Sequence, residues 1–198
     1  SKQHGDMMQH GLWQRLIRAR RVVGAHGGPP CETYSSARWI ELPDQRGPRP
    51  LRDSEMPWGR DYLMLHELQQ CVVGSTLMMV TLKLLLLVYL HGGSASMEHP
   101  KGNPESEEKW CIWMSSLIHW ILQGPDWRTL TFMQGPLGQC APKPTTMLLA
   151  RLIGFDAKIF GQYDMRWKPS FFLGGRDEQG WRTARAKVYP WRLSWAIA

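Results

Sequence analysis

The sequence has few cysteines, and they lie far apart. Cys31, Cys71, Cys111 and Cys140 form no CxxC pair and no Cys/His cluster with the spacing of metal ligands. We therefore expect neither a metal site nor a secreted disulfide scaffold. Unpatterned cysteines with no cleavable signal in front of them favour a reducing compartment, so we predict an intracellular protein, nuclear or cytoplasmic.

Internal repeats and low-complexity tracts are also missing. The 198 residues are 43% hydrophobic and 21% charged, which is typical of a globular domain with a real core. Lys and Arg number 24 against 17 Asp and Glu, so the net charge is +7. This balance favours a polyanionic partner such as nucleic acid, although an ordinary basic surface would have the same charge.

Long hydrophobic runs are limited to one segment. Residues 71–90 are as long as a membrane-spanning helix, but Lys83 lies in the middle, and Gly74 and Thr81 reduce the apolar character. A charge at the centre of a bilayer is costly. We therefore predict a buried helix and no membrane partner, and keep a membrane-anchored protein as the last alternative.

The remaining pattern alternates helices and strands, which predicts an α/β domain with a mostly parallel sheet flanked by helices. A last helix should open at Pro190. Residues 41–60 contain four prolines and should be irregular. Helices are expected over residues 7–21, 61–90 with a break near Gly74, and 110–123, and strands over residues 22–25, 94–97 and 129–133.

Aromatic and imidazole side chains add no separate motif. Trp110, Trp113 and Trp120 recur at helical spacing and predict a packing stripe. The four isolated histidines have no partner at ligand spacing, so we expect ordinary surface or core residues at His26, His66, His91 and His119.

One cysteine follows a short apolar stretch in the segment GGPPCETYS, residues 27–35. Two prolines fix the backbone in front of Cys31, and the glycines allow close approach of a flat ligand. A thiolate is a strong nucleophile when its surroundings lower its pKa. The segment therefore predicts a nucleophile that attacks an electron-poor ring carbon, while the plainer alternative is a structural cysteine beside a turn.

This segment resembles the Pro-Cys loop of the cytosine-5 DNA methyltransferases, usually written GPPCQxFS. The resemblance implies that Cys31 attacks C6 of a flipped-out cytosine, after which C5 takes a methyl group from S-adenosylmethionine. Pro30 and Ser35 would shape the loop. Glu32 stands where the family has Gln, and Tyr34 replaces Phe.

A second match lies at residues 98–100, Glu-His-Pro, directly after the expected strand. It resembles the family's Glu-Asn-Val loop, whose glutamate binds N3 and the exocyclic amine of the target base. The resemblance implies that role for Glu98, because a proton shared with N3 makes the ring a better electron sink. His99 departs from the family's Asn, which changes how the cysteine loop is braced. The alternative for Glu98 is a solvated loop carboxylate.

The third match is looser. Gln134 stands where the family has its Gln-x-Arg-x-Arg strand, and the resemblance implies that Lys143 contacts a phosphate; a plain turn is the alternative. Arg38, Arg49 and Arg52 follow the cysteine loop and could bind DNA phosphates, or belong to an ordinary charged loop.

The family's Phe-x-Gly-x-Gly loop, which holds the methionine end of the cofactor, has no counterpart in the sequence, and the cofactor-binding residues stay unassigned. We therefore predict a partial Rossmann-like, S-adenosylmethionine-dependent methyltransferase fold. Residues 1–198 would form one catalytic domain without its amino-terminal cofactor part, and the start at Ser1 indicates a processed or truncated product. The first hypothesis is a DNA-binding methyltransferase, and the second is an inactive relative that binds nucleic acid.

Overall fold

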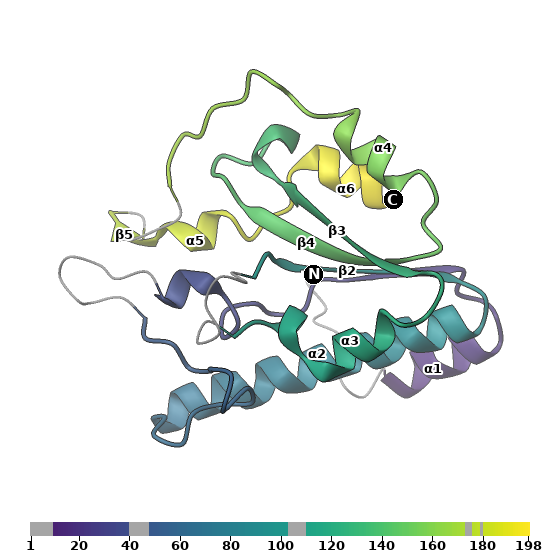
Figure 1. Ribbon diagram of the computed structural model, residues 1–198, viewed down its shortest axis with the longest axis horizontal. Coiled ribbons are helices and arrows are strands. Elements are labelled where there is room, and N and C mark those ends of the chain that lie inside the picture. The colour runs from purple at the N-terminus through teal and green to yellow at the C-terminus, as the bar shows by residue number, and fades with distance from the viewer. Residues whose placement is uncertain (1–9, 40–47, 103–109, 173–175, 179) are drawn as a thin grey trace.

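A four-stranded mixed sheet forms the centre of the molecule, with helices on both faces (Figure 1). The computed structural model describes residues 10–39, 48–102, 110–172, 176–178 and 180–198. The strands of the sheet are β1 (Gly24–Gly27), β2 (Ser94–Pro100), β3 (Trp127–Met133) and β4 (Pro144–Ala150). Their order is β1-β2-β4-β3, and only β1 and β2 are parallel.

The predicted α/β class is confirmed, whereas the prediction of a mostly parallel sheet is wrong. Strand β4 runs antiparallel to both of its neighbours. The connection from β3 to β4 is residues 134–143, with only the 3-10 turn η4 (Gly135–Leu137) inside it. A parallel pair needs a crossover of about a dozen residues or more, usually a helix, so this short link makes the pair a hairpin.

Helices α1 (His10–Arg18), α2 (Leu65–Leu90) and α3 (Ser116–Ile121) lie below the sheet in Figure 1, whereas α4 (Phe155–Phe160) and α6 (Trp191–Ile197) lie above it. Two apolar cores separate these layers. The short elements are η2 (Ser36–Trp39), η3 (Ile112–Met114), β5 (Arg176–Asp177), β6 (Gly180–Trp181) and α5 (Arg182–Arg185).

The long helix α2 presents one buried stripe to the sheet. Its buried residues recur three or four positions apart, as one helix face requires: Cys71, Gly74, Met78, Leu82, Leu85 and Val88. The helix begins at Leu65, where the Glu67 carboxylate accepts a hydrogen bond from the Met64 backbone N–H. It runs on through Gly74, so the expected break is wrong. A side chain at Gly74 would meet the Thr33 hydroxyl 3.0 Å away, which explains the small residue.

By length and composition alone, α2 is the one described helix that could cross a membrane, which is weak evidence. Only 33% of its most apolar window is buried. Leu65, Val72, Val73 and Leu90 are each more than half exposed. Burial therefore holds for a stripe rather than for the whole helix, and the membrane-anchored alternative remains an untested prediction.

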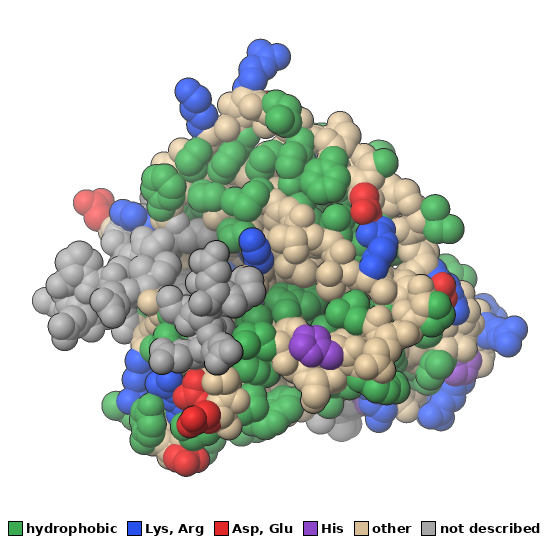
Figure 2. Space-filling view, viewed as in Figure 1, with side chains coloured by type: hydrophobic (Ala, Val, Ile, Leu, Met, Phe, Trp, Pro, Cys, Tyr) green, Lys and Arg blue, Asp and Glu red, His purple; other side chains and the backbone are tan. Residues whose placement is uncertain are grey.

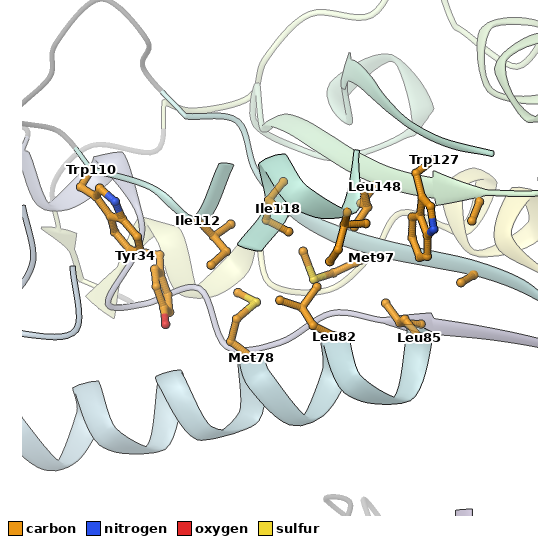
Figure 3. Close-up of a cluster of buried hydrophobic side chains, with 13 residues drawn as sticks. Tyr34, Met78, Leu82, Leu85, Met97, Trp110, Ile112, Ile118, Trp127 and Leu148 are labelled. Atoms are coloured by element: carbon orange, nitrogen blue, oxygen red, sulfur yellow. The ribbon is translucent and has the colours of Figure 1, made fainter. Parts of the chain in front are cut away.

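The core below the sheet joins α2 to β2, β4 and the segment around α3 (Figure 3). Tyr34 and Trp110 lie side by side at one end of this core, with ring centroids 5.6 Å apart. The expected helix over residues 110–123 is divided into η3 and α3, because Ser115 is extended and caps α3. Trp110 is buried but Trp120 is 62% exposed, so the predicted tryptophan stripe is wrong at Trp120.

Two strand boundaries also differ from expectation. β1 begins at Gly24 rather than residue 22, and Val23 is 84% exposed. β2 continues to Pro100, so Glu98 and His99 belong to a strand and not to the loop after it. Residues 7–9 of the expected first helix and 41–47 of the expected irregular loop lie outside the described residues.

Candidate functional site

The parallel pair of strands brings the two best-matched motifs together. In the register of β1 and β2, Gly27 is opposite Met97, so the chain leaves β1 beside Glu98. Groups that follow parallel strands meet at the carboxyl edge of a sheet, where α/β proteins place their ligands. Cys31 lies close enough to Glu98 and Lys143 for both charges to act on its thiol.

The Cys31 thiol is protonated in this arrangement. Burial, followed by the negative charge of Glu32, raises its pKa to about 11, and Glu98 acts in the same direction. Lys143 and Lys187 lower the pKa but do not compensate. Because the thiolate is the nucleophile, Cys31 needs a change in its surroundings before it can attack.

Packing against Tyr34 braces the cysteine loop. Tyr34 is 3% exposed, and its ring lies edge-on to His99 at a centroid distance of 5.5 Å. The Arg52 guanidinium lies over the same ring, 4.0 Å from its centroid. His99 is fully buried, and burial lowers its pKa to about 3; neither ring nitrogen has a side-chain partner among the described residues. His99 therefore supports the loop through ring packing.

Arg52 is not available to a DNA phosphate, and that prediction is wrong. It is 2% exposed and donates to the backbone carbonyls of Pro57 and Cys71. These bonds, with one to the Ser75 hydroxyl, tie the segment before α2 to the helix itself. A buried guanidinium is tolerated because carbonyl and hydroxyl oxygens accept from both of its terminal nitrogens, although Nε has no partner among the described residues.

The other two arginines are more exposed but also have partners within the chain. Arg38 donates to the Glu32 carbonyl at 2.6 Å and the Arg49 carbonyl at 2.9 Å, which closes the end of the cysteine loop. Arg49 forms an ion pair with Glu67. Ser35 and Pro30 are half-buried within the same loop.

Glu98 is the centre of a buried polar network. Its Oε1 atom accepts from Gln134 Nε2 at 3.1 Å and from the Thr145 hydroxyl at 3.3 Å, and lies 3.4 Å from Lys143 Nζ. Gln134 and Thr145 are fully buried. Four of the predicted residues, Cys31, Glu98, Gln134 and Lys143, therefore lie at one place, although their proposed roles remain untested.

Tyr189, which the sequence reasoning missed, completes the network. Its hydroxyl donates to Glu98 Oε2 at 3.0 Å and lies 3.3 Å from His26 Nε2. His26 Nδ1 is 2.9 Å from the Ser96 hydroxyl. Burial lowers the pKa of His26 to about 4, so its ring is neutral and can accept from Ser96 while donating to Tyr189. No local pattern marks Tyr189, because its partners come from strands far away in the sequence.

Comparison with known proteins adds no relative. No protein-family model matches the chain, and neither a curated protein nor a solved structure matches it. Within the described residues, no three His, Cys, Asp or Glu side chains come together as metal ligands would. Function therefore has to be argued from the Cys31–Glu98 site.

Proposed function

We propose that this chain is a DNA cytosine-5 methyltransferase-like protein that holds an unstacked cytosine between Cys31 and Glu98. One observation carries the proposal: a cysteine in the loop after β1 and a buried carboxylate on the adjacent parallel strand β2 share a site with Gln134 and Lys143. A base must leave the duplex stack to reach such a site. The Gly-Pro-rich segment before Cys31 suits close approach of a flat ring.

The proposed chemistry is reversible addition to the ring. The Cys31 thiol first gives its proton to water. Its thiolate then forms a bond to C6, and the C5–C6 electron pair moves through C4 to N3, which takes up a solvent proton relayed by Glu98. C5 becomes nucleophilic and takes a proton from water. The original C5 hydrogen then leaves to water, N3 returns its proton to solvent through Glu98, and cleavage of the S–C6 bond restores cytosine and a thiolate that water protonates.

The sheet supports in part the proposal of a Rossmann-like methyltransferase fold. A parallel pair covered on both faces by helices is the building unit of Rossmann-like folds. The antiparallel strand β4 departs from the simplest form of such a sheet, because it lies between β2 and β3 and not at an edge. S-adenosylmethionine would supply the methyl group in such a protein. The described residues do not fit that cofactor, because no glycine-rich turn joins a strand of the sheet to a helix N-terminus. We therefore assign no methyl-transfer step to them.

A second candidate is an inactive relative that binds nucleic acid. It is favoured by two features of the site, the protonated Cys31 thiol and a Glu98 carboxylate whose two oxygens are both engaged within the chain. The surface charge does not mark a DNA face by itself. On the face drawn in Figure 2, the described Lys and Arg side chains form separate groups rather than one patch.

Hydrogen exchange at C5 tests the proposed addition without a cofactor. A single-stranded oligonucleotide with one cytosine is incubated with the protein in D2O, and deuterium at C5 is measured by mass spectrometry. We expect exchange with the intact chain and loss of exchange in Cys31→Ser and Glu98→Gln. Cys140→Ser is the matched control, since that thiol is exposed and outside the site.

Binding of S-adenosylmethionine, measured by calorimetry, separates the two candidates further. Deuterium exchange at C5 without binding of S-adenosylmethionine would support base binding between Cys31 and Glu98, but not methyl transfer. Cytosine-independent DNA binding without exchange would favour the inactive relative and reject covalent chemistry at Cys31.

A further inference from the structure

A short carboxyl-terminal segment lies across the Cys31–Glu98 site. We call residues 186–189 the strap. Lys187 Nζ is 2.7 Å from Glu32 Oε1, next to the candidate nucleophile, and the Tyr189 hydroxyl donates to Glu98 Oε2. The strap backbone is fixed by Gln139, whose Nε2 donates to the Val188 carbonyl at 2.9 Å. Residues more than 150 positions apart in the chain therefore share one site.

The glycine that precedes the cysteine loop makes room for the strap. A Cβ atom at Gly28 would lie 2.5 Å from the Tyr189 hydroxyl, closer than any side-chain contact allows. The Lys143 ammonium lies 5.5 Å from the centroid of the Tyr189 ring. The phenol therefore fills the space between the segment leaving β1, the carboxylate of Glu98 and Lys143.

The position of Tyr189 conflicts with binding of a base. Glu98 Oε1 already has Gln134, Thr145 and Lys143 as partners, so Oε2 is the oxygen left to receive the donor groups of a ring. Tyr189 occupies Oε2. Oε2 has a second acceptor direction, but the phenol fills the space beside it between Gly28 and Lys143. A base therefore cannot reach Oε2 unless the phenol leaves.

We propose that the strap is an internal plug, and that a bound base must displace Tyr189 from Glu98. The identity of the ligand, a base, rests on the proposed function. The closure of the site rests on the contacts of Tyr189 with Glu98 and Gly28. The outer side of the strap is weakly held: Lys187 and Val188 are more than half exposed, and an exposed ion pair such as Lys187–Glu32 contributes little. Opening therefore mainly breaks the contacts of Tyr189 with Glu98, His26 and Lys143. The structure, with Tyr189 bonded to Glu98, then has the site in its closed form.

Tyr189→Phe and Tyr189→Ala test the plug. The first removes only the hydroxyl, and the second also removes the ring. Neither changes a charge near Cys31, so a faster reaction of its thiol reports access to the site. Tyr163→Phe is the matched control, because its hydroxyl accepts from the Met133 backbone N–H at the end of β3.

The first measurement is the rate of Cys31 alkylation by iodoacetamide, followed by mass spectrometry of the Cys31 peptide. We expect a rise of about tenfold in Tyr189→Phe, the factor for one hydrogen bond to a charged group, and a larger rise in Tyr189→Ala. Tyr163→Phe should leave the rate unchanged. Circular dichroism checks that both Tyr189 variants are folded. If Cys31 alkylation is unchanged or slower in both folded variants, the strap is not a plug.

The second measurement is the affinity for an oligonucleotide with one cytosine, compared with the same oligonucleotide carrying thymine. The plug predicts that Tyr189→Phe tightens cytosine binding by about the same factor. Weaker cytosine binding would overturn the plug and make Tyr189 part of the base site. Faster alkylation with no preference for cytosine would leave the closure intact and reject the proposed ligand.

Discussion

The two ends of the central sheet are both buried, but they are built from opposite kinds of residues. At one end Ala95 of β2 is paired with Ala150 of β4, and the next two residues of β4 towards its start, Leu149 and Leu148, are fully buried. At the other end the same strands carry buried polar side chains, which are Glu98 and His99 on β2 and Thr145 and Thr146 on β4. The polar end lies beside the Cys31 loop, whereas the apolar residues Ala95, Leu148, Leu149 and Ala150 belong to the two cores.

This difference separates the end that supplies stability from the end on which the proposed function depends. Apolar burial contributes about 25 cal/mol per Å², whereas a buried carboxylate costs free energy unless neighbouring donors satisfy it. Glu98 has such donors on both oxygens. A sheet needs no charged group in its interior to fold, so the polar end is the part of the sheet on which the proposed function depends.

The largest effect should come from the apolar end. Leu148→Ala removes a fully buried side chain from β4 and should lower the free energy of unfolding by about 3 kcal/mol. Ile153→Ala, at a fully exposed position just past the strand, is the control and should change it by less than about 0.5 kcal/mol. Urea denaturation measures both. Equal losses would show that β4 does not anchor the core.

A smaller effect is expected at the polar end. Glu98→Gln keeps the shape of the side chain but leaves Lys143, which is 12% exposed, without its counter-charge. We expect a loss of about 2 kcal/mol, because hydrogen bonds to a charged group disappear. Lys143→Met should cost less, since Glu98 keeps the neutral donors Gln134, Thr145 and Tyr189. A stabilised Glu98→Gln protein would contradict the view that this carboxylate is satisfied.

The sequence predicted the long helix and the strands next to its best motifs. α2 was predictable because its apolar run is too long for a strand, although the apolar residues in that run show almost no helical period. β4 was not, because it begins at the proline of a turn-like Lys143-Pro144, and residues 145–150 are buried on both faces and show no alternation. Because β4 was not predicted, the β3–β4 hairpin and the antiparallel pairing of β4 with β2 were not predicted either.

The candidate site was predictable only where short motifs mark it. Cys31 and Glu98 were identified from local patterns, and the parallel register of β1 and β2 brings them together. Tyr189 and His26 have no such pattern, since their importance comes from contacts made by the fold. Arg52 was misread because sequence alone does not reveal whether an arginine between prolines is buried.

The smallest predicted effect concerns Glu32, the residue that departs from the family's Gln. Its carboxylate is the largest cause, after burial, of the raised pKa of Cys31. Glu32→Gln should lower that pKa and increase the thiolate fraction, so alkylation of Cys31 at pH 8 should become roughly threefold faster. The change also frees Lys187 from its ion pair, which acts in the same direction. Glu55→Gln, an exposed carboxylate that is not among the charges acting on the thiol, is the control. A rate unchanged by Glu32→Gln would mean that burial alone keeps the thiol protonated, and the polar end would then be closed to chemistry until the strap moves.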